Sequence, residues 1–229
     1  MAKHIGIVAC SAEGAALCYR TICVEGANVM GEHAHPEITM HTHPLSAYMD
    51  HIVPGNWEGV ADLMVDSAKK VAQLGADFAI CPDNTIHQAF DQVIAQSSIP
   101  WLHIAEVVAE EAQLQSHRCI GILGTRYLME GPVYPEKLIA TGLAYQIPTP
   151  DEREQLNAII FDELVYGRFL EPSRQYFCRT IDRLKSEGCD AVLLGCTEIP
   201  LLITPDVSPL PTLDSTRLLA RAALKKATA

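Results

Sequence analysis

The sequence contains two copies of one short pattern, separated by a constant offset. Residues 75–83 align without a gap on residues 188–196, an offset of 113 positions (188 − 75). Upstream, residues 5–10 resemble residues 120–125, at an offset of 115 positions (120 − 5). Such internal similarity predicts two homologous half-domains. The first copy ends in an aspartate and the second in a cysteine, so Asp83 and Cys196 occupy equivalent places.

Composition limits the kinds of protein that this chain can be. Its 229 residues, 48% of them hydrophobic, suffice for two compact units with cores of their own. No run approaches the roughly 18 apolar residues of a membrane span, and the first residues enter a strand pattern directly, so we expect a cytoplasmic protein that does not bind a membrane. The eight cysteines are scattered through apolar segments, which favours reduced core residues over disulfides. A net charge of −11 without a basic cluster argues against a nucleic-acid partner and favours a small ligand.

Short apolar segments alternate with longer segments of helical spacing. The expected strands are residues 4–9, 37–41, 78–81, 101–104, 119–123 and 191–194. The expected helices are residues 57–74, 104–115, 135–141, 153–165 and 172–187. This alternation predicts an α/β fold of two pseudo-symmetric domains, each a central parallel sheet flanked by helices.

The ends of the repeats suggest where the two domains divide. Residues 214–227 match the segment that follows Trp101, so each half is expected to donate its last helix across the junction. The predicted domains are residues 1–98 together with 209–229, and residues 99–208. Gly75 and Gly188 each follow a helical segment and precede a strand, the usual place of a glycine that ends a helix.

Polar residues follow the strands that end each copy of the repeat. In parallel α/β sheets, ligands bind beyond the carboxyl ends of the strands. Asp83, Asn84 and Thr85 lie at one such end, and Cys196 and Thr197 at the other. If the halves face each other about a pseudo-two-fold axis, Asp83 and Cys196 flank a ligand in the cleft between them, as two-sided proton transfer at a carbon centre requires. The alternative is a duplication without a shared site.

Two motifs carry a family resemblance over essentially the whole chain. The segments 82–87 and 195–200, with Gly124-Thr125 and a helix expected to end at Arg168, resemble the aspartate/glutamate racemase family. The Gly-Cys-Thr-Glu sequence after an apolar strand is similar to the aspartate-type branch. Relatives of this family include maleate isomerase, hydantoin racemase and arylmalonate decarboxylase. The resemblance implies a cofactor-independent isomerase, without PLP or a metal, that acts on an acidic amino acid as a homodimer.

The resemblance also implies roles for individual residues. Asp83 and Cys196 are the expected catalytic pair. The substrate-binding residues expected with them are Asn84, Thr85, Thr125, Thr197 and Arg168. Cys10 and Ser11, which follow the strand expected at residues 4–9, and His43, from the histidine-rich segment, are also expected to bind substrate. Helix capping is the competing explanation for the Asn and Thr residues, and a solvated position at the end of a helix is the competing explanation for Arg168. Glu198 is expected to be structural.

Two features depart from the family pattern. The loop of residues 9–14 lacks the glycine-rich, Met-containing form typical of aspartate racemases, and Asp83 stands where a thiol is usual. Reference pKa values of about 3.9 and 8.5 differ by roughly 4.6 units, so protonated Asp83 with ionised Cys196 lies about 6 kcal/mol above the reverse arrangement. Such a pair favours one direction of proton transfer unless burial or neighbouring donors shift both groups. An amino-acid racemase is the leading hypothesis. A cofactor-independent decarboxylase or cis-trans isomerase of a dicarboxylic acid through Cys196, and a non-catalytic ligand-binding protein, are the alternatives.

Histidines concentrate in one part of the chain. Five of them, His33, His35, His41, His43 and His51, fall within nineteen positions. Two or three histidines with an acidic residue can bind a transition metal. No further ligand spacing completes a recognised motif, so we expect polar pocket or surface histidines, with His43 lining the substrate site.

Overall fold

The computed structural model describes residues 2–229, and the chain divides into two compact units. Unit 1 comprises residues 1–107 and 216–229, and unit 2 comprises residues 108–215. One boundary falls within helix α5 (Ile104–Leu114) and the other after the first residue of α11 (Ser215–Thr228). Helices of both units therefore continue across the boundaries.

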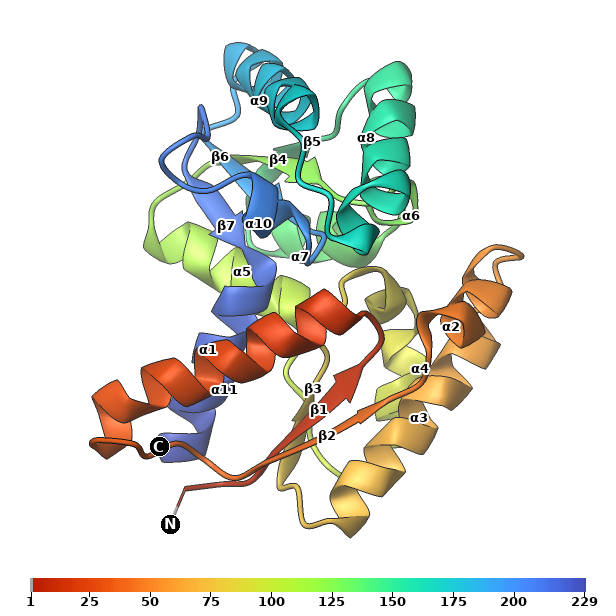
Figure 1. The fold of residues 1–229 in the computed structure, drawn as a ribbon, viewed down its shortest axis with the longest axis vertical. Helices are drawn as coiled ribbons and strands as arrows, with labels where there is room; N and C mark the ends of the chain where they lie inside the picture. The colour runs from red at the N-terminus through yellow and green to blue at the C-terminus, as the bar shows by residue number, and fades with distance from the viewer. Residues whose placement is uncertain (1) are drawn as a thin grey trace. The chain divides into compact units, whose positions relative to one another are not determined.

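Unit 1 is built on a parallel sheet with the strand order β2-β1-β3 (Figure 1). Its strands are β1 (Ile5–Ala9), β2 (Ile38–Thr42) and β3 (Phe78–Ile80). Ala79 of β3 also forms an isolated parallel bridge with Trp101. The helices of this unit besides α5 and α11 are α1 (Ala12–Met30), α2 (Leu45–Ile52), α3 (Trp57–Gln73), the 3-10 helix η1 (Thr85–Ala89) and α4 (Phe90–Ile94).

Unit 2 is built on a parallel sheet with the order β5-β4-β6-β7. Its strands are β4 (Cys119–Leu123), β5 (Ala144–Gln146), β6 (Ala191–Leu194) and β7 (Thr212–Asp214). Its remaining helices are α6 (Arg126–Met129), α7 (Val133–Ala140), α8 (Pro150–Asp162), the 3-10 helix η2 (Leu164–Tyr166), α9 (Glu171–Ser186) and α10 (Ile199–Leu202).

The two copies of the sequence repeat have the same strand order and equivalent hydrogen bonds. If the Trp101 bridge is counted as a fourth strand position, the two sheets have the same order. In unit 1 the Asp77 carboxylate accepts the backbone N–H of His4 at 2.7 Å. Asp190, which is 113 positions later, accepts the N–H groups of Arg118 and Cys119 at 2.9 and 3.2 Å. Each copy therefore uses an aspartate before its strand to hold the start of the neighbouring strand.

The α/β prediction of parallel sheets flanked by helices is confirmed, with local corrections. The expected strand at residues 101–104 is only a bridge at Trp101, because α5 begins at Ile104. The sequence analysis missed α1, α2, β5 and β7, and it also missed the short helices α4, α6, α10, η1 and η2. Exposed Val24 and Val29, together with buried Gly26, blur the amphipathic pattern of α1. The helix-ending glycines are confirmed, since Gly75 and Gly188 have φ angles of 96° and 101°.

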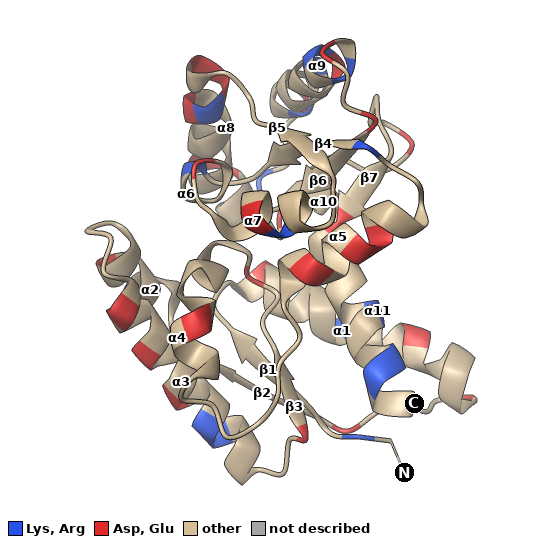
Figure 2. Cartoon of the chain, turned by 180° about the vertical axis from the view of Figure 1, so that it is seen from behind, with Lys and Arg blue, Asp and Glu red and all other residues tan. Residues whose placement is uncertain are grey.

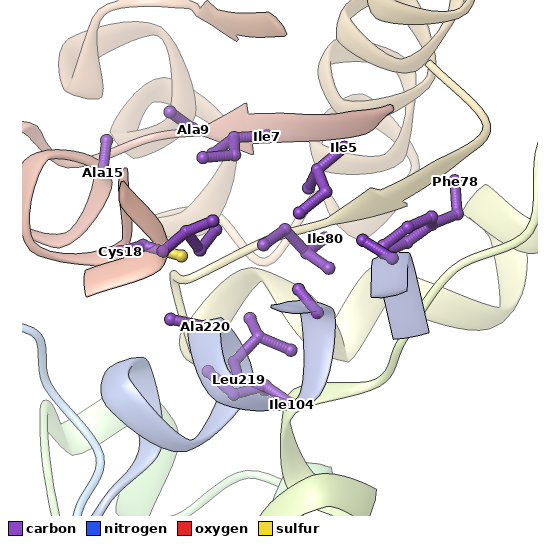
Figure 3. Close-up of a cluster of buried hydrophobic side chains, with 13 residues drawn as sticks. Ile5, Ile7, Ala9, Ala15, Cys18, Phe78, Ile80, Ile104, Leu219 and Ala220 are labelled. Carbon is purple, nitrogen blue, oxygen red and sulfur yellow. The ribbon is translucent and has the colours of Figure 1, made fainter. Parts of the chain in front are cut away.

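One core cluster of unit 1 fills the space between the sheet and two helices (Figure 3). Isoleucine side chains of β1 and β3 meet Ile22 and Cys18 of α1 and Leu219 of α11, and all of these residues are buried. These strands are buried along their whole length, which explains why their sequences are apolar without alternation. The rigid sheet then holds its strand ends in fixed positions.

Helix α3 approaches β1 so closely that the strand needs a glycine. A methyl group on Gly6 would lie 2.7 Å from Val71 Cγ2, whereas one on the equivalent Gly121 would lie 3.0 Å from Leu184 Cδ1. We expect Gly6→Ala to lower the free energy of unfolding by about 1–3 kcal/mol. Gly121→Ala should cost less, because the end of a leucine side chain can rotate away while branched Val71 is stiff. Urea unfolding of both variants tests this, and equal losses would contradict it.

The surface carries many acidic residues, as the charge of −11 requires. Acidic side chains recur along α3 and α5 (Figure 2). Over residues 2–229, no helix combines the length and the apolar character needed to cross a membrane.

Candidate active site

The carboxylate of Asp83 is held by the loop that follows β1. Its Oδ2 accepts the backbone N–H of Cys10 and its Oδ1 accepts that of Ser11, both at 3.1 Å. Ser11 is the N-cap of α1, a helix of 19 residues, and the N-terminus of a helix attracts negative charge. Both contacts stabilise the ionised carboxylate.

Sheet topology explains why these residues meet. Strands β1 and β3 are parallel neighbours, so their carboxyl ends lie at the same edge of the sheet. The turn after β3 is fixed by His87, whose Nδ1 donates to the backbone oxygen of Asp83 at 2.9 Å. Its Nε2 accepts the N–H of Ile104 at 3.4 Å. Burial, reinforced by nearby His103, lowers the pKa of His87 to about 3, so the ring is a neutral positioning group.

Two cysteines and a tyrosine lie close to Asp83. Cys81 is fully buried, with its Sγ 3.7 Å from the backbone oxygen of Asp83, and burial raises its pKa well above the ordinary value. Cys10 retains 6% exposure. Burial also raises the pKa of Tyr48, with the charges of Cys81, Cys10 and Asp83 adding to the shift. The Tyr48 hydroxyl lies near Ser67 but, within residues 2–229, makes no hydrogen bond of acceptable geometry.

In unit 2, the turn after β6 carries a thiol paired with a carboxylate. Cys196 Sγ donates to Glu198 Oε2 at 2.9 Å, and Thr197 Oγ1 donates to the same oxygen at 2.8 Å. Glu198 is 3% exposed, whereas Cys196 is half-buried. A carboxylate in this position can accept the thiol proton. The sequence analysis did not foresee this contact of Glu198, although the two-residue spacing in the Cys-Thr-Glu turn was a usable signal.

A polar network lies at the end of β2, where the histidines were expected to have a role. His43 Nε2 and Lys70 Nζ lie 2.7 and 2.6 Å from Oδ2 of Asp66, and His41 Nδ1 lies 2.9 Å from the Ser67 hydroxyl. Burial, followed by the charge of Lys70, lowers the pKa of His41. The hydrogen bond from Lys70 lowers the pKa of Asp66. One ligand atom each of His41, His43 and Asp66 lies within 4.8 Å of the others, so Asp66 is the acidic partner that sequence spacing did not reveal.

The other residues of the histidine-rich segment make separate contacts. His35 Nδ1 lies 2.8 Å from the backbone oxygen of Pro36. His33 is exposed beside Glu32, and His51 lies 3.1 Å from the Asn56 amide. The network at the end of β2 is therefore made by His41 and His43 alone among these five histidines.

The remaining predicted residues occupy capping or exposed positions. Asn84 is the N-cap of η1 and Thr85 its first residue. Thr125 caps α6 by accepting the N–H of Leu128 at 3.3 Å. The helix expected to reach Arg168 ends earlier, at Asp162, and Arg168 lies on the exposed turn after η2 with its guanidinium 5.7 Å from the centre of the Tyr166 ring.

Comparisons with known proteins cover nearly the whole chain. The model of the Asp/Glu/Hydantoin racemase family matches residues 7–223. A broad specificity amino-acid racemase of Bacillus subtilis, RacX, is 22% identical over 187 residues, which are 82% of this chain and 80% of that protein.

Two solved structures are similar throughout. A protein of Yersinia pestis assigned as an Asp/Glu racemase has a TM-score of 0.91 at 30% identity, covering 99% of this chain and 100% of the other. An aspartate racemase homologue from Pyrococcus horikoshii has a TM-score of 0.86 at 28% identity, with both chains fully covered. Both solved structures thus share the fold over essentially the whole chain.

Proposed function

Because this chain belongs to the Asp/Glu/Hydantoin racemase family, a family of isomerases, we propose that it is a cofactor-independent amino-acid racemase. The observation that carries the proposal is the pair formed by the Cys196 thiol and the Glu198 carboxylate. Racemisation removes a proton from Cα on one face and returns a proton on the other. A positioned thiol can serve as the acid, and its thiolate as the base, for one of these transfers.

In this proposal unit 2 serves one face of the substrate. Glu198 accepts the proton of the Cys196 thiol, and the resulting thiolate removes the Cα proton. In the opposite direction the intact thiol donates its proton to the carbanion. Thr197, which binds the same oxygen of Glu198, keeps that carboxylate oriented.

Unit 1 serves the opposite face through the polar groups at the end of β3. Asp83 stands at the place in the repeat that is equivalent to Cys196. Donors of the two turns, including Asn84, Thr85 and Thr197, would stabilise the enediolate-like intermediate. Arg168 and His43 are the proposed contacts for a second carboxylate, which favours aspartate and glutamate as substrates.

Proton NMR in D₂O tests the proposed reaction directly. The purified protein is mixed with the L and D forms of aspartate, glutamate and a panel of neutral amino acids, and loss of the Cα proton is followed together with chiral analysis. We expect exchange with inversion for at least one acidic amino acid. No exchange for any substrate would contradict the proposal and favour a ligand-binding protein, or the decarboxylation or isomerisation of another acid.

A further inference from the structure

We propose that Cys10 is the catalytic thiol of unit 1 and that Asp83 acts through it as a proton acceptor, in the way that Glu198 acts for Cys196. This inference deepens the proposed racemase function and rests on it. In this inference Asp83 does not remove the substrate proton itself. The base is a thiol–carboxylate pair, with Cys10 after β1 and Asp83 after the neighbouring strand β3.

The position of Cys10 supports this role. The residue follows the last residue of β1 and precedes Ser11, the N-cap of α1. Its backbone N–H donates to Asp83 Oδ2 at 3.1 Å. The charges of its thiol and of the Asp83 carboxylate both raise the pKa of the buried phenol of Tyr48. Cys10 and Asp83 are therefore neighbours at one strand edge, beside the N-terminus of a long helix that favours a thiolate.

The other thiols near Asp83 do not fit the role. Cys81 and Cys18 have no exposed surface, and the Sγ of Cys81 contacts the backbone oxygen of Asp83 rather than its carboxylate. A substrate atom cannot touch either sulfur. Cys10 and Asp83 retain 6% and 9% exposure, so neither residue is completely enclosed.

Asp83 itself is poorly suited to remove a carbon-bound proton. Backbone N–H groups bind both of its oxygens, which fixes the carboxylate against the loop after β1 and leaves fewer of its lone pairs for a carbon-bound proton. The same contacts orient it toward the loop that carries Cys10. A carboxylate fixed in this way can accept a proton from a neighbouring thiol, which then acts on the substrate.

With Cys10 in this role, both faces of the substrate meet the same chemical groups. In one direction the Cys10 S–H proton moves to Asp83, and the Cys10 thiolate takes the Cα proton while the C–H electron pair delocalises into the substrate carboxylate. The Cys196 thiol then gives its proton to the other face of Cα. Asp83 releases one proton to water and Cys196 recovers one, so no proton is gained or lost. The reverse reaction begins at Cys196 with Glu198 as acceptor.

Reciprocal exchange experiments test this assignment. Cys10→Ala, Cys10→Ser and Cys196→Ala are compared with the wild-type protein in D₂O, using the amino acid that the wild-type protein racemises. We expect each variant to lose racemisation by about 100-fold or more. The Cys10 variants should still exchange the Cα proton of one enantiomer only, and Cys196→Ala that of the other enantiomer only.

The controls separate a catalytic thiol from a structural one. The backbone N–H of residue 10 still binds Asp83 in every Cys10 variant, so the anchoring of the carboxylate survives. Cys23→Ser removes a half-buried thiol of α1 in the same unit and should leave activity unchanged. Racemisation by Cys10→Ser within threefold of wild type would overturn the inference. The inference would also be overturned if Asp83→Asn lost the Cα-proton exchange at this face while Cys10→Ser kept that exchange. A wild-type protein that exchanges no amino acid would instead refute the proposed function.

Discussion

Cys196→Ala is expected to lower kcat for racemisation by about 1,000-fold or more, because no remaining group of that turn can donate a proton to Cα. Positioned acids and bases contribute about 10²–10⁴-fold to catalysis, and this thiol serves one face in both directions of the reaction. Chiral chromatography of the product from either enantiomer measures the loss. Cys178→Ala removes another half-buried thiol of unit 2 and should have little effect on the rate.

Glu198→Gln should separate the role of the carboxylate from that of the thiol. Glutamine has nearly the same shape but cannot take the thiol proton, so we expect kcat to fall by about 100-fold while KM and thermal stability change little. A variant that loses stability in proportion to its activity would show that the buried Glu198 is structural. Unchanged kcat would rule out the thiol–carboxylate pair as the catalytic unit.

Acid should destabilise the fold through His87. The pKa of this ring is about 3 in the folded protein and about 6.5 in an unfolded chain, so between these values the unfolded state binds more protons. The stability that depends on neutral His87 is fully present above pH 6.5. It falls by up to about 1.4 kcal/mol for each pH unit below that value. At pH 5 the loss from His87 alone is about 2 kcal/mol.

Urea unfolding at pH 7 and pH 5 measures this loss. His87→Asn keeps a donor for the backbone oxygen of Asp83 but carries no titrating ring. We expect the variant to be less stable than wild type at pH 7. That difference should shrink by about 2 kcal/mol at pH 5. His33→Asn, at an exposed site, should leave the pH dependence unchanged. Parallel stability curves for wild type and His87→Asn would show that this ring is not buried in its neutral form.

The sequence analysis recovered most elements whose pattern is local. The strands that carry Gly6 and Gly121 are apolar on both faces, as buried parallel strands must be, and positive φ angles at Gly75 and Gly188 mark helix ends. It missed α1, because exposed valines interrupt the helical pattern, and β5 and β7, which have only three residues each. Strand β3 is equally short, but all of its residues are buried and apolar, whereas β5 and β7 are partly exposed and show no such run.

The candidate site was only partly predictable for a related reason. Asp83 and Cys196 could be paired from the repeat, because equivalent residues of a duplication occupy equivalent places. The contact of Cys196 with Glu198 lies within one turn, so the spacing of the two residues could have indicated it. The contact of Cys10 with Asp83 spans 73 positions, and nothing in either local sequence announces it.

By itself, the sequence determined the duplication, the class of fold and the residues that follow each strand, because hydrophobic period, glycine placement and repeated motifs are local properties of the chain. Only the tertiary structure decided which of those residues meet. Parallel pairing of β1 with β3 brings Cys10 and Ser11 to the carboxylate of Asp83, and the packing of α3 beside β2 brings Asp66 to His43. The register of neighbouring strands sets these contacts, and distant segments acquire a register only when the sheet forms.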